Sequence, residues 1–580
     1  MLYTKIILMD KLYANQAEVW RSRASGIGRR LHTGVHVKRR TMTVLACTAL
    51  LTGCVPIQPL AEPPERPDVF SADADGRAFE DGGNLVMALS SEPDRLDPTT
   101  SSSLYTRYVM QTVCEKLYDI DEQGEIVPML ASELPEVSNG GRTVRIPVRD
   151  GITFADGTDF NAEAVKTTIE RGLTLEESSR AAELGPITSI TAIDERTVEV
   201  EFETPFAPFT AALADRAGMI MSPTALETAG DDFGDNPVCV GPFKFEERIP
   251  QTSISVVKDP NYYNADAVRL DSITYQIMSD ANIRAANIRS GDVQVADTIS
   301  PQDVDALTQE SGIGLLQSNS LGYQGLTVNM GFGDDPENYE TPLGQNPQVR
   351  QALSMAIDRT ALVNTVFNGW FSPACSGISP DSPFATDASN ACLEYDPEGA
   401  KQLLEEAGVE LPLTVTLKVS NTQDSLRFAQ AVQAATREAG FDIRVQPIEY
   451  TALLDAQDRG DYELLQLGWS GRVDPHGNLY TFLYPGAANN VTGIDDPELS
   501  DLLTRASETT DLEERKSLYG QASARSRETN SIIYLYRQRN LTAYTDDVAG
   551  IEVYSDGVVH LSEAGFLAEE EDASAAGAQR

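Results

Sequence analysis

Histidine is scarce in this chain, with four residues among 580. Two of them lie within the first 53 residues, so only His476 and His560 remain in the rest of the sequence. Zinc sites draw on several clustered His or Cys ligands, so this supply excludes a histidine-cluster metal site. We therefore expect neither a metal centre nor a cofactor.

Basic residues are also few relative to acidic ones. The chain has 45 Lys and Arg against 88 Asp and Glu, which gives a net charge of −43. Removal of residues 1–53 would take away nine basic and two acidic residues, leaving 36 and 86 and a net charge of −50. A field of this sign repels phosphate groups, which excludes nucleic acid as a partner. The acidity itself is explained by solubility.

Near the N-terminus the apolar run Met42–Leu51 is too short for a membrane-spanning helix, which needs roughly 20 residues. It follows basic Lys38–Arg40 and precedes Thr52-Gly53-Cys54, a pattern typical of a secretory signal peptide. Small residues before a cysteine resemble the bacterial lipobox, in which that cysteine is diacylated. We expect residues 1–53 to be removed, with Met42 or a nearby residue as an alternative start. Acylated Cys54 would then hold the protein on the outer face of the cytoplasmic membrane. The alternative is an ordinary signal peptide with a chance cysteine.

Four cysteines follow Cys54, and an even number in an exported protein predicts disulfides. Cys375 and Cys392 flank a Pro-, Ser- and Asp-rich loop of 16 residues, which makes them the natural pair. Elimination then pairs Cys114 with Cys239.

No catalytic set stands out from the sequence. The segment Gly468–Arg472 resembles a nucleophile elbow around Ser470 but lacks its final glycine. His476 is the nearest candidate base for Ser470, without a third partner. The absence of a nucleophile, base and orienting group counts against an exported hydrolase, which we keep as an alternative.

From Asn84 onward, strand-like and helix-like segments alternate. Residues 197–202 show the period-two pattern of a strand, and Val349–Val366 has helical spacing of its apolar residues. Asn161 and Asp396 stand where helix N-caps belong. Mixed alternation of this kind predicts α/β lobes.

A series of short segments, spread in order along the chain, carries a family resemblance. The segments are Glu92–Pro98, Gly124–Ala131, Arg149–Thr158, Phe160–Glu163, Asn236-Pro237, Gly241–Phe245, Val349–Arg359, Ala400–Gly408, Gly468-Trp469 and Asp474-Pro475. Together they resemble the peptide- and nickel-type solute-binding proteins of ABC importers. The resemblance runs from about residue 84 to about residue 557.

The resemblance implies an α/β periplasmic-binding-protein fold, with two lobes, a hinge and a ligand cleft between the lobes. Residues 84–325 and 536–566 would form lobe I, and residues 326–535 would form lobe II. The Pro- and acid-rich segment 54–83 predicts a flexible tether, and the acidic segment 567–580 a disordered tail. The β-rich runs Leu326–Asn329 and Ile533–Tyr536 suit the two hinge crossings.

In peptide binders of this family, ligand-pairing stretches follow the early Asp-Pro of lobe I and surround the Gly-Trp of lobe II. In this sequence the matching residues are Ser102, Ser103, Leu104, Gly468, Trp469, Ser470, Gly471 and Arg472. Their backbone would pair with a peptide by strand addition, and the tryptophan would supply an apolar wall, unless it is a core residue.

Arg472 departs from the family, whose peptide binders often carry an aspartate there for the peptide ammonium. An arginine would instead attract a carboxylate, sulfate or phosphate. Asp474 could restore the ammonium contact, or could hold Arg472 in place.

The sequence therefore predicts a non-catalytic, lipid-anchored and monomeric receptor. It would capture a peptide, or else an anionic or conjugated small molecule, and deliver it to an ABC permease with its ATPase. A signalling or adhesion lipoprotein on the same fold is a further alternative.

Overall fold

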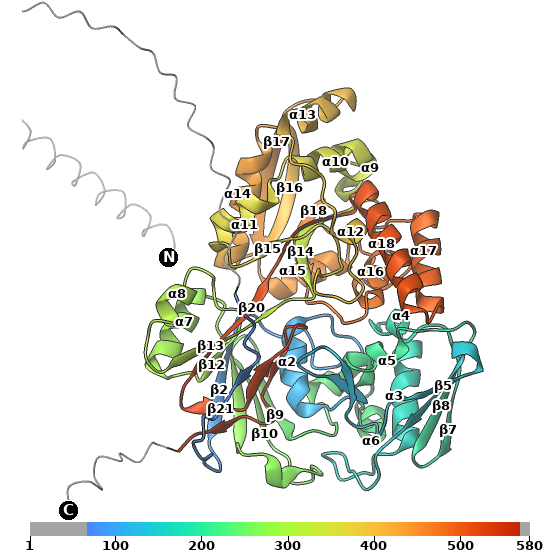
Figure 1. Ribbon diagram of the computed structural model, residues 1–580, viewed down its shortest axis with the longest axis vertical. Coiled ribbons are helices and arrows are strands. Elements are labelled where there is room, and N and C mark those ends of the chain that lie inside the picture. Colours follow the sequence, from blue (N-terminus) through green and yellow to red (C-terminus); the bar gives the residue numbers. More distant parts are fainter. Residues whose placement is uncertain (1–65, 569–580) are drawn as a thin grey trace, which may run out of the picture. The chain divides into compact units, whose positions relative to one another are not determined.

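Two mixed β-sheets organise residues 66–568, the part of the chain that the computed structural model describes (Figure 1). In the first, β2, β11 and β12 run parallel, and the outer strands are antiparallel to their neighbours. Its order is β13 (Ile313–Asn319), β20 (Arg539–Thr545), β12 (Val295–Ala296), β2 (Asn84–Leu89), β11 (Ser272–Ile277), β10 (Ser253–Lys258) and β9 (Phe243–Ile249).

The second sheet has six strands, of which β16 is parallel to both β17 and β18. Strand β14 lies antiparallel between β18 and β19. The order is β15 (Ser372–Pro373), β19 (Ile532–Arg537), β14 (Tyr323–Val328), β18 (Leu464–Trp469), β16 (Leu413–Ser420) and β17 (Phe441–Ile448).

The chain passes between these two sheets at residues 319–323 and again at residues 537–539. The runs expected to be hinge crossings, Leu326–Asn329 and Ile533–Tyr536, belong instead to the interior of the six-stranded sheet, apart from Asn329, which follows β14. We use "first lobe" for the described residues before 320 and after 538, and "second lobe" for residues 323–537. The lobe limits expected from the sequence stay a prediction.

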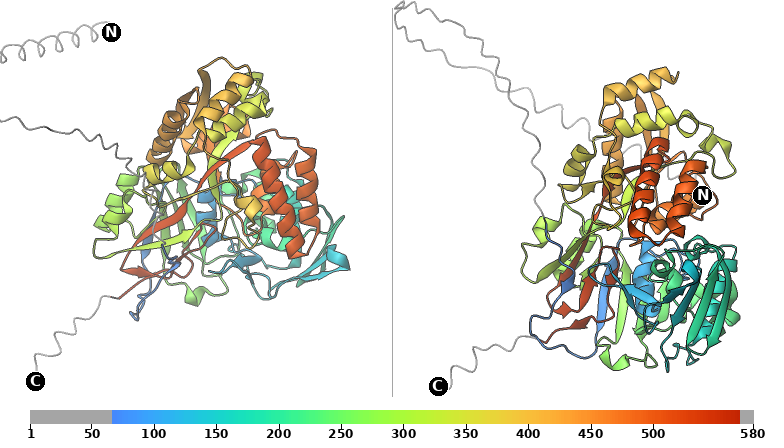
Figure 2. Two further views of the ribbon diagram at one scale, coloured as in Figure 1. Left: turned by 45° about the horizontal axis from the view of Figure 1, so that its top comes forward. Right: turned by 45° about the vertical axis from the view of Figure 1, so that its right-hand side comes forward.

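Smaller sheets complete the first lobe. A four-stranded antiparallel sheet forms a separate layer, visible at the lower right of Figure 1. The C-terminal strands lie beside the first strands of the lobe (Figure 2). The strands are β5 (Glu136–Ser138), β6 (Thr143–Pro147), β8 (Thr197–Phe202) and β7 (Ile187–Asp194); β1 (Ser71–Ala72), β22 (Ile551–Val553) and β23 (Val559–His560); β3 (Tyr118–Ile120) with β4 (Ile126–Pro128); and β21 (Val548–Ala549) with β24 (Gly565–Phe566).

The helices cover the faces of these sheets. Those of the first lobe are α2 (Leu104–Val113), α3 (Ala162–Thr174), α4 (Ala181–Leu184), α5 (Phe209–Ala212), α6 (Pro223–Ala229), α7 (Ala281–Ser290) and α8 (Val304–Leu307). Those of the second are α9 (Pro342–Gln345), α10 (Pro347–Met355), α11 (Arg359–Phe367), α12 (Asp387–Asn390), α13 (Pro397–Glu406), α14 (Gln423–Thr436), α15 (Tyr450–Asp458), α16 (His476–Leu483), α17 (Pro497–Glu508) and α18 (Leu512–Thr529).

Strand β19 shows how the second lobe is packed. Ile533 and Leu535 point into a core shared with α10, α11, α13 and α14, whereas Ile532 and Tyr534 point into a core shared with α16, α17 and α18. Successive strand residues face opposite sides, so the sheet is covered on both faces. The first of these cores continues into the first lobe through Ala88 and Leu541.

Local sequence signals explain most helix starts. Asn161 caps α3 by accepting from the N–H groups of Glu163 and Ala164, and Asp396 caps α13, as predicted. The single helix predicted over 349–366 is wrong. Asp358 accepts from the N–H of Ala361 and starts a second helix, so the segment divides into α10 and α11.

Residues 66–83, expected to belong to a flexible tether, are packed on the first lobe. Val69 pairs with Gln317, β1 pairs with β22, and Arg539 binds Asp68 at 2.7 Å. These backbone and ionic contacts outweigh the polar composition of the segment. The predicted signal peptide, Cys54 with residues 55–65 of the tether, and residues 569–580 of the tail lie outside the described residues.

The structure joins Cys114 to Cys239 and Cys375 to Cys392, the two pairs expected from the sequence. Within residues 66–568, no helix combines the length and the apolar character needed to cross a membrane.

Candidate functional site

A cavity of about 180 Å³ lies between the two large sheets and takes its walls from both lobes. Ser90 follows β2 and Thr298 lies two residues beyond β12; across the cavity, Ser420 ends β16 and Ser470 follows β18. All four strands run parallel to a neighbour and end here. In open α/β sheets, ligands bind outside the carboxyl ends of the strands, which makes this cavity the candidate site.

Four helices also begin at this cavity. The first residues of α2, α7, α14 and α15, namely Leu104, Ala281, Gln423 and Tyr450, all line it. Each helix N-terminus presents backbone N–H groups and about half a positive charge. Carboxylates cap two of these ends, Asp280 at α7 and Glu449 at α15, whereas hydroxyls cap α2 and α14, so the latter two ends favour negative charge in the cavity most.

Two charged side chains line the cavity, one from each lobe. Arg284 of α7 is buried and donates to the carbonyl oxygens of Met278 (2.7 Å) and Thr298 (2.8 Å). Asp424 of α14 forms an ion pair with Arg427 and accepts from Ser300 at 3.0 Å. The carboxylate is therefore neutralised within the protein, whereas the guanidinium has only neutral partners.

The loop before α2 brings Ser102 to the cavity wall. The N–H of Ser102 donates to Asp94 at 2.9 Å, and Asp94 also accepts from the hydroxyls of Ser101 and Thr106. Burial raises the pKa of Asp94, but these hydrogen bonds outweigh it, so the pKa lies below its ordinary value. Because this N–H is occupied, Ser102 offers a ligand its carbonyl and hydroxyl oxygens only.

The edge of β18 that faces β16 is open at its carboxyl end. Strand β16 pairs with β18 only at Leu464 and Leu465. From Gln466 to Gly468 the same edge lines the cavity. An extended ligand could therefore add to β18 as a short strand.

Trp469 combines the two roles considered for it. Its side chain packs on Phe482 in a core of the second lobe, and its Nε1 donates to Asn478 at 3.0 Å. Trp469 also lines the cavity. The guanidinium of Arg472 lies 4.1 Å from the ring centroid, close enough for a cation–π contact.

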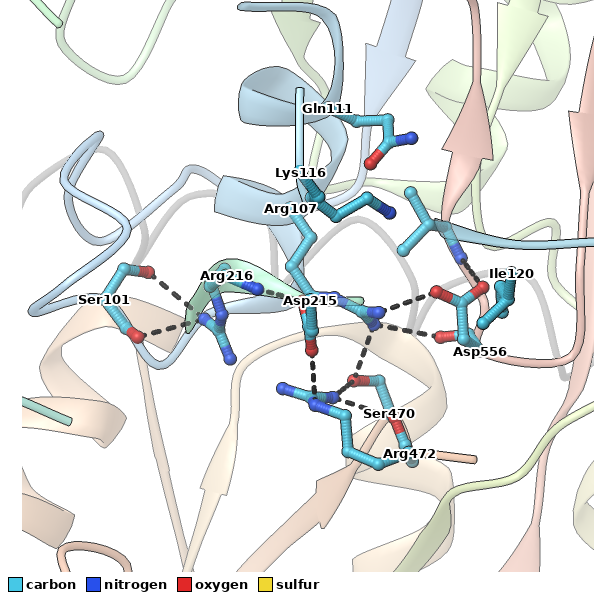
Figure 3. Close-up of polar contacts among 12 residues, drawn as sticks. Ser101, Arg107, Gln111, Lys116, Ile120, Asp215, Arg216, Ser470, Arg472 and Asp556 are labelled. Carbon is cyan, nitrogen blue, oxygen red and sulfur yellow. Dashed lines mark hydrogen bonds and ion pairs between the residues drawn. The ribbon is translucent and has the colours of Figure 1, made fainter. Parts of the chain in front are cut away.

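A buried charged network joins the lobes beside the cavity (Figure 3). Asp215 of the first lobe accepts from Arg107 Nε at 3.0 Å and forms an ion pair with Arg472 of the second. Arg107 also binds Asp556 at 2.6 Å and donates to Ser470 Oγ at 3.3 Å. Burial alone would raise the pKa of Asp215, but the guanidinium groups hold it well below its ordinary value. Burial lowers the pKa of Arg472 to about 10 in spite of Asp215.

Five of the nine expected ligand residues line the cavity: Ser102, Leu104, Gly468, Trp469 and Ser470. The other four, Ser103, Gly471, Arg472 and Asp474, do not line it, and each has a structural role.

Ser103 is buried and caps α2, and its carbonyl accepts from Arg216 at 3.1 Å. Gly471 has φ +94°, and a Cβ there would meet the backbone N of Gly322 at 2.5 Å. Asp474 forms no ion pair with Arg472 and does not line the cavity, because its carboxylate pairs with Arg515 at 2.8 Å.

The elbow-like segment does not form a catalytic pair. Ser470 Oγ accepts from Arg107 and Arg472, and no side chain among residues 66–568 hydrogen-bonds a ring nitrogen of His476. Burial lowers the pKa of His476 to about 4.

A second cavity, of about 970 Å³, is lined by Val473 and Asp474, immediately after the loop residues that form the network. It lies at no parallel strand end, and exposed Leu134 and Val137 form part of its wall. The smaller cavity therefore fits a bound solute better.

Sequence reasoning missed Arg284, Asp424, Tyr105 and Tyr450, all of which line the cavity. A signal existed for two of them, since Asp424 and Tyr450 stand at predictable helix starts after Thr422 and Glu449. Nothing local distinguishes Arg284 from Arg289 on the same helix.

The family model for bacterial extracellular solute-binding proteins, family 5 Middle, matches residues 125–490. The glutathione-binding protein GsiB of Shigella flexneri serotype 5b is 28% identical over 485 residues, which is 82% of this chain and 92% of that protein. GsiB of Pectobacterium atrosepticum is also 28% identical, over 83% of this chain and 94% of its own.

Solved structures share the fold. The binding protein AgaA from A. tumefaciens R10, solved with agropinic acid, has a TM-score of 0.76 and 27% identity, covering 84% of this chain and 99% of its own. AppA from Bacillus subtilis, solved with a nonapeptide, has a TM-score of 0.77 at 22% identity, covering 85% and 100%. The expected α/β periplasmic-binding-protein fold is thereby confirmed.

Proposed function

This chain belongs to the bacterial extracellular solute-binding proteins of family 5, and we propose that its cavity encloses a solute about the size of a dipeptide or small tripeptide. It is a non-enzymatic receptor for peptides or related solutes that serves an ABC importer. The cavity at the strand ends of both lobes carries the proposal. Its 180 Å³ has room for roughly a dozen water-sized groups, comparable to the non-hydrogen atoms of a dipeptide.

The contacts follow from the cavity walls. The backbone of Gln466–Gly468 pairs with an extended solute from the second lobe, and Ser102 supplies oxygen acceptors from the first. Trp469 provides an apolar surface, while Leu104 and Ser470 close the ends of these two stretches. Relatives that bind glutathione or peptides by name support a peptide-like solute.

Because the solute is bound from both lobes, closure of the lobes around it is the step that signals binding to the importer. Only a closed protein offers the solute both walls, and the Asp215–Arg472 ion pair joins the lobes in this form. Closing therefore converts occupancy into a shape that a permease can recognise.

Outside the described residues, Cys54 supplies the membrane anchor. A diacylated cysteine keeps a globular body on the outer face of the cytoplasmic membrane, where a single chain would hold it only marginally. We take the working form to be a monomer.

The test is binding without turnover. Glutathione, Ala-Ala and Ala-Ala-Ala are titrated by calorimetry and thermal melting, and each solute is recovered afterwards for mass analysis. We expect at least one to raise the melting temperature and to be recovered unchanged. Trp469→Ala should weaken this binding, whereas Trp370→Ala, at a tryptophan outside the cavity, should not. Hydrolysis of a bound solute, or no binding and no co-purified solute, would contradict the proposal.

A further inference from the structure

We infer that the solute carries a carboxylate and no net positive charge, and that Arg284 is the residue that binds this carboxylate. The inference rests on the proposed function, because it names the chemical class of the solute in that same cavity.

Arg284 is a cation at the cavity wall that forms no ion pair with any described residue; the buried Asp297 lies nearby but outside ion-pair distance. Arg284 is 3% exposed, and within the described residues no carboxylate lies within ion-pair distance of it. Two of its five N–H donors bind the carbonyls of Met278 and Thr298, and its Nε has no partner in the part of the chain that the structure describes. A buried guanidinium with unused donors is costly unless an anion completes it, and a carboxylate matches its planar geometry.

The start of α14, on the opposite wall, adds unused donors. Thr422 caps this helix through the N–H of Ser425 alone, so Gln423 and Asp424 keep backbone N–H groups for which the described part of the chain supplies no acceptor. These donors stabilise negative charge at this wall of the cavity, whereas the carboxylates of Asp280 and Glu449 already cap the starts of α7 and α15.

The cavity offers an ammonium group much less. Asp424 is the one carboxylate that lines it among the described residues, and Arg427 and Ser300 already bind it. Asp297 lies behind the wall and accepts from Ser90 (2.7 Å) and Thr298 (3.0 Å). Burial raises the pKa of Asp297 despite the nearby arginine, which further reduces its value as a partner for a cation.

Arg472, the arginine expected to bind an anion, is not available for this role. Its guanidinium pairs with Asp215 and stacks on Trp469, and its side chain does not line the cavity. The anion contact therefore moves from the second lobe to α7 of the first.

The experiment measures how the full chain binds probes that share one dipeptide core but differ in charge. Ala-Ala, N-acetyl-Ala-Ala and Ala-Ala amide differ in their end charges, and glutathione is added as a larger acid. We expect the two free acids to bind, N-acetylation to change affinity little, and amidation to weaken binding by about 10- to 100-fold, as for loss of a charged hydrogen bond. Equal binding of acid and amide would overturn the inference while leaving the proposed function standing.

Variants then locate the contact. Arg284→Gln should lose the preference for acid over amide, and Arg284→Lys should restore part of it. The matched control is Arg289→Gln, on the same helix but partly exposed and paired with Glu310, which should bind all probes as the wild type does. Melting of the ligand-free variants identifies misfolding.

Asp424→Asn should leave the affinity for the free acids unchanged or raise it. A loss of that affinity in Asp424→Asn, with Arg284→Gln binding as the wild type does, would show that an ammonium is the anchored group and overturn the inference. No binding of any probe, and no co-purified solute, would remove the proposed function itself.

Discussion

Replacement of Asp215 by asparagine should destabilise the closed form of the protein more than its fold. In the wild type this carboxylate lies between Arg107 of its own lobe and Arg472 of the other. After Asp215→Asn, Arg107 keeps Asp556 at 2.6 Å, but Arg472 keeps only uncharged partners, namely Ser470, the Gly471 carbonyl and the ring of Trp469. Removing one partner of a buried ion pair costs about 3–5 kcal/mol. Opening returns Arg472 to water, so the closed state bears most of that cost, and solute affinity should fall about 100-fold.

Calorimetry with a solute that binds the wild type measures this effect. The double variant Asp215→Asn/Arg472→Gln should bind more tightly than Asp215→Asn alone, because no uncompensated charge remains buried. Asp556→Asn serves as the control: it removes a partner of Arg107 within the first lobe, and should lower the melting temperature of the ligand-free protein with little effect on affinity. A double variant that binds more weakly than either single variant would refute the reasoning.

The same ion pair should not make closure sensitive to pH near neutrality. The pKa of Asp215 is well below its ordinary value, so the stabilisation is present above the unfolded pKa of about 3.9 and is lost only as the pH falls through the folded value. Affinity that changed between pH 6 and 8 in step with Asp215→Asn would contradict this.

Three further predictions concern other parts of the chain. Burial raises the pKa of Glu115 to about 7, although Tyr262 donates to it. This group should therefore stabilise the fold most below pH 4–5, and its contribution, on the order of 3 kcal/mol, should be lost as the pH rises through 7. Glu115→Gln should reduce the dependence of the melting temperature on pH. Removing the Cys375–Cys392 disulfide should lower the free energy of unfolding by about 3 kcal/mol, and removing Cys114–Cys239, which closes a far longer loop, by about 5 kcal/mol. Denaturant unfolding of the two variants measures this order, and the opposite order would contradict the loop-length argument. Cys54→Ala should leave folding intact and release the protein from membranes on fractionation, and unchanged retention would exclude the anchor.

Local features were predictable from the sequence where their partners are also local. Asn161 and Asp396 bind N–H groups within three residues, and the loop between Cys375 and Cys392 is short. The break inside 349–366 was missed because apolar spacing continues through it, while the carboxylate of Asp358, which accepts from the N–H of Ala361, decides where the second helix begins.

The candidate site was predictable only in part. Ser102 and Trp469, two of the residues that the resemblance implies, line one cavity, and their contact with a solute stays a prediction. The resemblance could not place Arg472, whose partner Asp215 is distant in sequence and belongs to the other lobe. Arg284 and Arg289 each follow the same three residues, Ala-Asn-Ile, and only the packing of α7 buries one and exposes the other.

Between β19 of the second lobe and β20 of the first there is a single residue, Gln538. Gln538 lines the cavity, and its side chain accepts a hydrogen bond of 3.2 Å from Gln324 of β14, next to the other crossing of the chain. A rotation of one sheet against the other must change the backbone at this joint, since the strands on both sides are held by their ladders. A solute bound in this cavity, as proposed, would therefore contact the connection between the lobes as well as the lobes themselves. Solutes that differ in shape near Gln538 would therefore set different angles between the lobes. The conformation of the receptor would then depend on which solute is bound, and not only on whether one is bound.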